Sequence, residues 1–284
     1  MARVAAAGAR LLRRTGRRCV GAGLAVPSAV AQPGGTAVSP LYVAWPTGTP
    51  IWDIFTRQVA RAGITGPAGA PAACWADNDI NLAALAEHRH GAGRSAGHLL
   101  VVATGHHGVG GALVVGGALY TGSTGLGMEA GHVSVDPAGR PCRCGSRGCL
   151  NVETDALSFM DAAGRVPGRQ TAVLEQAIDI LRREYAADPA VRTAAAELIE
   201  RLGLGLAGLV NVLNPDRILL GGLHRYLLEA DPVRLRAAVA ERSPWGRGAG
   251  VPLLACVLDE GSLIGAAELA WQPVLDNPAV LNAG

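Results

Sequence analysis

The apolar and polar positions of the chain follow a helical period in some segments and form short apolar runs in others. The helical period predicts helices over residues 5–18, 51–63, 78–87, 172–213 and 262–271. The Asp188-Pro189 pair is expected to break the longest of these, because proline lacks the N–H that a helix interior needs.

Apolar runs bounded by glycine and proline predict buried strands. They lie at residues 19–26, 98–105, 111–122, 214–222 and 251–259. Glycine and proline make residues 32–40 and 64–76 look like loops. Strands that alternate with helices favour an α/β protein.

Composition agrees with a globular protein. The 284 residues are 49% hydrophobic and 17% charged, which argues against extended disorder. The net charge of +2 gives no strong overall positive potential that would attract nucleic acid. No apolar run reaches the roughly 20 residues that span a bilayer.

The amino terminus resembles an export signal, with paired arginines, an apolar run and an Ala-Val-Ala ending in residues 11–32. The glycines and Pro27 inside the apolar run fit a buried strand that enters a turn equally well. We expect a cytoplasmic protein with no membrane partner, in which clustered cysteines indicate metal or redox chemistry.

Such a cluster lies in "GHVSVDPAGRPCRCGSRGCLN", where His132 precedes Cys142, Cys144 and Cys149. One imidazole and three thiolates form a tetrahedral donor set suited to zinc. A disulfide or unrelated thiols are the alternatives, but a Cys-x-Cys pair is poorly placed to bond internally.

Polar residues at two other places suggest ligand binding. Asp79 follows Asn78 at the start of a helix, where it could cap the helix or accept a hydroxyl proton as a general base. Glu129 precedes His132 by three residues and could be an exposed carboxylate or a partner of sugar hydroxyls. Backbone N–H groups of Gly108, Gly110 and Gly111 could wrap phosphate, or belong to a hairpin turn.

These features in this order resemble the ROK family of bacterial sugar kinases and sugar-responsive repressors. The matching segments are "GAGLAVPSAV", "DNDINLAALAE", "GVGGALVVGG", "GMEAGHVSVDPAGRPCRCGSRGCL", "NPDRILLGG" and "LIGAAELA". The resemblance implies an actin/hexokinase-like (ribonuclease H-like) α/β fold with a sugar between two lobes. We expect a small lobe over residues 1–98, completed by a helix at 262–284, and a large lobe over 99–261 with a zinc loop at 132–149.

The resemblance also implies site residues. His132, Cys142, Cys144 and Cys149 would hold structural zinc. Asn78, Asp79, Glu129 and His132 would line the sugar pocket, with Asp79 as the base if the protein is a kinase that uses ATP and Mg²⁺. A homodimer is also expected.

Departures from the family pattern favour a regulator. The Asp-x-Gly-Gly-Thr turn that grips ATP phosphate is missing, and the second phosphate turn reads Gly105-His106-His107-Gly108 instead of Gly-Thr-Gly. Phosphoryl transfer depends on such grips, so we expect little kinase activity. By this resemblance, Asn151 falls at a position of the sugar pocket where members of the family usually carry Glu.

The winged helix-turn-helix of the repressors is also missing, so DNA would be bound only through an absent amino-terminal domain. We therefore expect the sugar-sensing part of a truncated regulator. The alternatives are a glucokinase-like sugar kinase and an inert zinc-stabilised scaffold.

Overall fold

The computed structural model describes residues 1–38, 41, 43–106, 108–169, 172–244 and 250–281. They form two compact units. The first contains Met1–Ala86, Thr121–Gly127 and Glu260–Gly284, and the second contains Glu87–Tyr120 and Met128–Asp259.

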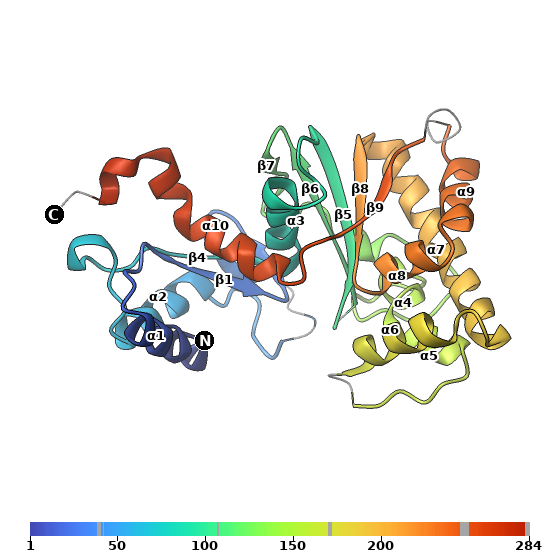
Figure 1. Ribbon diagram of the computed structural model, residues 1–284, viewed down its shortest axis with the longest axis horizontal. Coiled ribbons are helices and arrows are strands. Elements are labelled where there is room, and N and C mark those ends of the chain that lie inside the picture. Colours follow the sequence, from blue (N-terminus) through green and yellow to red (C-terminus); the bar gives the residue numbers. More distant parts are fainter. Residues whose placement is uncertain (39–40, 42, 107, 170–171, 245–249, 282–284) are drawn as a thin grey trace. The chain divides into compact units, whose positions relative to one another are not determined.

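The first unit holds two small sheets with helices packed against them (Figure 1). Strands β1 and β4 pair in parallel, and β2 and β3 form an antiparallel pair. The elements are α1 (Ala2–Thr15), β1 (Ala22–Val26), β2 (Ala29–Ala31), β3 (Thr36–Val38), α2 (Ile51–Arg61), η1 (Pro67–Gly69), β4 (Cys74–Asn78), the start of α3 (Asp79–His90), α10 (Gly261–Asp276) and η4 (Pro278–Leu281).

The apolar core of this unit joins α1 to α2. Ala5 and Ala9 of α1 pack with Phe55 and Val59 of α2. These four positions recur at a spacing of four residues in each helix, so one face of each helix is buried and the opposite faces meet water.

The second unit is built on a five-stranded sheet in the order β7-β6-β5-β8-β9. Strands β5, β8 and β9 run parallel, while β6 and β7 are antiparallel to their neighbours. The elements are β5 (His98–Gly105), β6 (Gly108–Val115), β7 (Ala118–Leu119), η2 (Ala130–His132), α4 (Leu150–Glu153), α5 (Ala156–Ala162), α6 (Val173–Glu184), α7 (Pro189–Leu213), β8 (Arg217–Gly221), α8 (Leu223–Ala230), α9 (Pro232–Arg242) and β9 (Leu253–Ala255).

Helices α4 to α9 lie on one face of this sheet (Figure 1). Alternate strand residues such as Leu100, Val102, Ile218 and Leu220 point into the core that these helices cover. The long helix α7 crosses that core and buries apolar residues that recur along it from Val191 to Val210.

Most predicted elements are present. The predicted break between two helices is confirmed, because Asp188 caps α7 by accepting a hydrogen bond from the N–H of Ala190, and Pro189 occupies its first turn. Two loop predictions were wrong in part. Residues 36–38 of the loop predicted at 32–40 form β3, and residues 74–76 of the loop predicted at 64–76 begin β4, which extends to Asn78, the predicted first residue of a helix. Both strands are too short or too polar at one end to show the strand pattern.

The described helices include none with both the length and the apolarity to cross a lipid bilayer.

Candidate functional site

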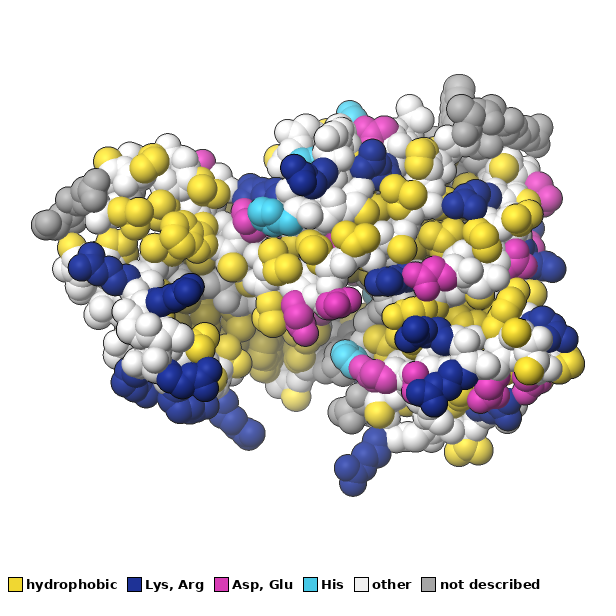
Figure 2. All heavy atoms as spheres, viewed as in Figure 1, with side chains coloured by type: hydrophobic (Ala, Val, Ile, Leu, Met, Phe, Trp, Pro, Cys, Tyr) yellow, Lys and Arg dark blue, Asp and Glu magenta, His cyan; other side chains and the backbone are white. Residues whose placement is uncertain are grey.

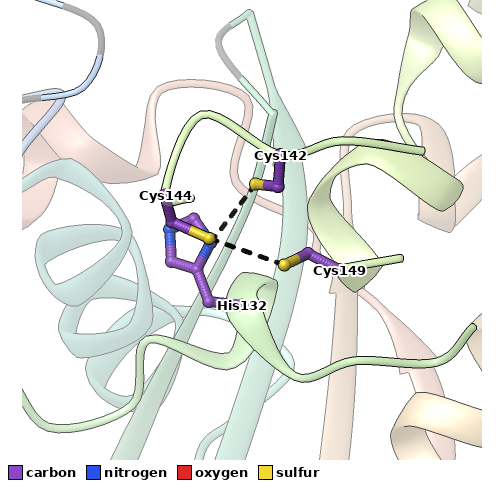
Figure 3. Close-up of side chains that lie close together, drawn as sticks. All are labelled: His132, Cys142, Cys144 and Cys149. Atoms are coloured by element: carbon purple, nitrogen blue, oxygen red, sulfur yellow. Dashed lines mark hydrogen bonds between the residues drawn. The ribbon is translucent and has the colours of Figure 1, made fainter. Parts of the chain in front are cut away.

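The residues of the predicted metal centre lie together in the second unit (Figure 3). One donor atom from each of His132, Cys142, Cys144 and Cys149 lies within 4.8 Å of the other three. The Sγ atoms of Cys144 and Cys149 are 3.6 Å apart, and Cys142 Sγ is 3.7 Å from His132 Nδ1. A disulfide needs about 2.05 Å between sulfurs, so these cysteines are free thiols.

The separations fit a tetrahedral metal centre. With metal–sulfur bonds of about 2.3 Å and metal–nitrogen bonds of about 2.0 Å, two donors at the corners of a tetrahedron lie roughly 3.5–3.8 Å apart. The two measured separations fall in this range. The donor set and its spacing are therefore suited to Zn²⁺ with no position left for a reacting ligand.

Hydrogen bonds within the loop bring these residues together. The N–H of Cys142 donates to the Ser146 carbonyl at 2.8 Å, which closes a tight turn. The N–H of Val135 donates to the Gly148 carbonyl at 2.7 Å and ties the two ends of the loop to each other. Gly148 has a φ of 58°, and a Cβ there would overlap the Asp136 carbonyl, so no other residue fits this turn.

The local electrostatics show what a cation would contribute. Burial raises the pKa of the Cys149 thiol to about 12, and the two neighbouring thiols add to this rise. A backbone hydrogen bond at Ser146 lowers the pKa of Cys144. A bound cation would stabilise the thiolate form of all three cysteines, because thiolates are the metal-binding species.

Glu153 anchors the loop, a role that the sequence did not reveal. Its side chain is 1% exposed. One carboxylate oxygen accepts a hydrogen bond from the Arg140 N–H at 2.7 Å, and the other pairs with Arg201 at 2.9 Å. The partner Arg201 comes from α7, distant in sequence, so no local motif marks the pair.

Asn151 follows the metal loop and is 4% exposed. Its Oδ1 accepts a hydrogen bond from the Val109 N–H at 2.7 Å. The side chain thereby joins α4 to the start of β6. Direct contact of Asn151 with a sugar stays a prediction.

Glu129 immediately precedes η2, the short helix that ends at His132. The residue is exposed, yet partial desolvation of its carboxyl group raises its pKa, and the nearby His132 opposes this rise. A carboxylate beside an imidazole can accept hydrogen bonds from a polyhydroxyl ligand.

Asn78 and Asp79 belong to the first unit, where β4 ends and α3 begins. Asn78 Oδ1 accepts hydrogen bonds from the N–H groups of Ile80 and Asn81, so Asn78 is the residue that caps α3. Its Nδ2 donates to the Ser28 carbonyl at 3.1 Å. Asp79, the first residue of α3, is half-buried and does not have to serve as the cap.

Asp77 is a buried carboxylate of this site that the sequence analysis missed. Its Oδ1 accepts hydrogen bonds from the Asn78 N–H and from Asn81 Nδ2. Burial raises its pKa, and these two hydrogen bonds act in the opposite direction. Three consecutive polar residues at the carboxyl end of a strand were the available signal, because ligands often bind at such strand ends.

The predicted phosphate-binding glycines lie in a strand rather than in a turn. Gly108 begins β6, and Gly110 and Gly111 lie inside it, paired with β5. A Cβ at Gly111 would press on Ala130 of η2, so the lack of a side chain lets the segment before the metal loop pack onto the strand. In the connection, His106 Nε2 is 3.6 Å from Glu175 Oε1, while His107 lies outside the described residues.

Comparison with known sequences shows a family relationship. A sequence model of the ROK family matches residues 4–272. A glucokinase from Halalkalibacterium halodurans is 34% identical over 157 residues, covering 51% of this chain and 47% of that protein. A putative xylose repressor from Caldicellulosiruptor sp. is 26% identical, with coverages of 81% and 56%. An N-acetylglucosamine repressor from Escherichia coli O157:H7 is 28% identical, with coverages of 72% and 51%. The chain thus spans about half the length of these relatives.

Solved structures of similar fold include kinases and a regulator. A ROK hexokinase from Thermus thermophilus aligns with a TM-score of 0.74 at 27% identity, covering 97% of this chain and 88% of that one. A ROK glucokinase from Streptomyces griseus, in complex with glucose and AMPPNP, aligns with a TM-score of 0.73 at 25% identity, with coverages of 91% and 83%. A ROK transcriptional regulator aligns with a TM-score of 0.77 at 22% identity, with coverages of 99% and 71%, and bears on the fold alone. The predicted actin/hexokinase-like α/β fold is confirmed.

Proposed function

This chain belongs to the ROK family, and on that premise we propose that it is the sugar-sensing part of a transcriptional regulator and not a sugar kinase. Relatives of both kinds match it, so similarity does not choose between them. The choice rests on the residues that a kinase would need for phosphate.

The observation that carries the proposal is the connection between β5 and β6. In ROK kinases a Gly-Thr-Gly turn there grips phosphate, whereas this chain has imidazoles, and His106 lies 3.6 Å from Glu175. A carboxylate beside that turn would repel the phosphates of ATP. Phosphoryl transfer relies on positioning and charge neutralisation, so this arrangement is unfavourable for a kinase.

The side chains that the family resemblance places in the sugar pocket are polar groups that can bind a sugar. We assign Asn78, Asp79, Glu129 and His132 to sugar binding. Carboxylates, amides and imidazoles can each donate to or accept hydrogen bonds from sugar hydroxyls. A cytoplasmic location and a homodimer stay predictions.

The metal cluster supports this assignment. We propose that His132, Cys142, Cys144 and Cys149 hold a structural zinc ion. Because His132 Nδ1 faces Cys142, this nitrogen is the metal ligand and Nε2 is left for a sugar hydroxyl. When bound, zinc would supply the positive charge that the buried thiolates need.

A coupled ADP-release assay separates regulator from kinase. The chain is incubated with Mg-ATP and glucose, N-acetylglucosamine or xylose, beside the variant Asp79→Asn, which keeps the shape but not the basicity. We expect no sugar-dependent ADP release from either protein. Sugar-dependent turnover that falls by roughly 10² or more in Asp79→Asn, the usual contribution of a general base, would establish a kinase and overturn the proposal.

A further inference from the structure

The net charge of +2 is the sum of a strongly basic amino-terminal segment and an acidic remainder of the chain. Residues 1–61 contain eight arginines and a single acidic residue, Asp53, for a formal charge of +7. The remaining residues contain 17 basic and 22 acidic side chains, for a formal charge of −5. The positive charge therefore belongs to one end of the chain, which forms α1, α2 and the strands between them.

The arginines of α1 form a stripe on the water-facing side of the helix. Arg3, Arg10 and Arg14 are seven and four residues apart, so they recur on one face, and Arg13 lies beside them. The buried residues Ala5 and Ala9 point away from this stripe, into the core shared with α2. From Arg3 to Arg14 the helix rises about 17 Å at 1.5 Å per residue.

Neighbouring arginines extend the stripe into a patch. Arg17 and Arg18 follow shortly after α1. All six side chains are exposed. Figure 2 shows basic side chains gathered over α1, and among the described residues no carboxylate pairs with any of the six. We call these six residues, Arg3, Arg10, Arg13, Arg14, Arg17 and Arg18, the arginine patch.

We propose that the arginine patch binds the phosphate backbone of duplex DNA. One strand of B-DNA carries a phosphate about every 3.4 Å along the axis, so the roughly 17 Å stripe of α1 faces about five phosphates. Guanidinium groups on flexible stems bind such a row without reading base sequence. This contact goes beyond the proposed sugar sensing and does not depend on it.

The structure favours DNA over a lipid surface. A helix that lies in a membrane interface needs a bulky apolar face for the lipid. The apolar face of α1 consists of Ala5, Ala9 and the partly buried Leu12, which already pack in the core shared with α2. Val4 and Leu11 are the large apolar side chains exposed on α1, too few to form such a face.

Fluorescence anisotropy with a labelled 30-base-pair duplex of arbitrary sequence tests the proposal. The binding constant of the full chain is measured between 50 and 200 mM NaCl. If six of the arginines contact phosphates, the logarithm of the binding constant falls with a slope of about −5 against log salt, so affinity drops about a thousandfold over this range. No binding at 50 mM salt overturns the proposal.

Two variants with equal charge loss locate the contact. The triple variant Arg10→Gln, Arg13→Gln, Arg14→Gln should reduce the slope by about 3 and weaken binding at 50 mM salt by at least about tenfold. The control Arg94→Gln, Arg169→Gln, Arg236→Gln removes three exposed arginines of the second unit and should bind as the unmodified chain does. Equal loss in both variants, or no loss in the first, contradicts the assignment.

Vesicles of phosphatidylcholine with 30% phosphatidylserine provide the remaining comparison. Vesicle binding without duplex binding would overturn the choice of nucleic acid. Since all substituted side chains are exposed, circular dichroism should show the same melting curve for both variants and the unmodified chain.

Discussion

Removing the carboxylate of Glu153 should release the metal loop while leaving the rest of the second unit folded. In Glu153→Ala the Arg140 N–H loses the acceptor that it contacts at 2.7 Å, and Arg201 loses its partner at 2.9 Å. An unsatisfied buried donor costs about 1–3 kcal/mol.

Loss of the Glu153–Arg201 ion pair costs less stability than loss of a fully buried ion pair would. The Arg201 side chain is 35% exposed and can turn to water, so we discount the roughly 3–5 kcal/mol that breaking a buried pair costs. Together we expect about 3 kcal/mol for Glu153→Ala. Glu153→Gln keeps an acceptor for the Arg140 N–H and should cost about 1 kcal/mol.

Hydrogen exchange of peptides from residues 136–150 measures this loss locally, which matters because a chain of two units need not unfold in one step. A loss of about 3 kcal/mol raises exchange by roughly 100-fold. The control Asp179→Ala removes an exposed carboxylate that pairs with Arg183 at 3.6 Å within α6, and exchange of the loop should stay unchanged. Unchanged exchange in Glu153→Ala would show that Glu153 does not hold the loop.

Three further predictions concern the metal loop and the buried histidine. Elemental analysis should find about one zinc per chain. The zinc should be lost in Cys144→Ser and kept in Cys256→Ser, whose thiol lies outside the cluster. A metal-free chain with intact thiols would refute the zinc assignment. Gly148→Ala should abolish zinc retention because its Cβ overlaps the Asp136 carbonyl, whereas Gly208→Ala on α7, where a Cβ meets no atom within 4 Å, should keep the metal; the same zinc content in both would refute the steric argument. Burial lowers the pKa of His224 to about 4. The unfolded chain then binds more protons than the folded chain between pH 6.5 and 4, so lowering the pH through this range should cost up to about 3 kcal/mol of stability. Thermal melts of His224→Gln should depend less on pH over this range. A variant with the same pH dependence as the unmodified chain would contradict this prediction.

Local sequence signals predicted those parts of the fold that depend on neighbouring residues. The break before α7 was predictable because Asp188 and Pro189 act within one turn. The strand β4 was missed because it follows a glycine- and proline-rich segment and ends in the polar Asp77 and Asn78. What makes it a strand is pairing with β1, some fifty residues earlier, which no short window contains.

The residues of the candidate site also differ in whether neighbouring sequence could predict them. The four metal-binding residues were predictable because they lie in one short segment whose composition matches a zinc site. Glu153 was not, because Arg201 reaches it from α7 only in the folded chain. The charge of +2 likewise suggested no nucleic-acid partner, because a total over the whole chain does not show that the arginines of α1 share one exposed face of that helix.

Calorimetric titration of the zinc-loaded chain with glucose, N-acetylglucosamine and xylose, in the absence of ATP, tests sugar sensing most directly. We predict a saturable heat for at least one of the three sugars, lost in Asp79→Ala and kept in the exposed control Asp179→Ala. Silence with all three sugars, from a chain that is folded and retains its metal, would contradict the account.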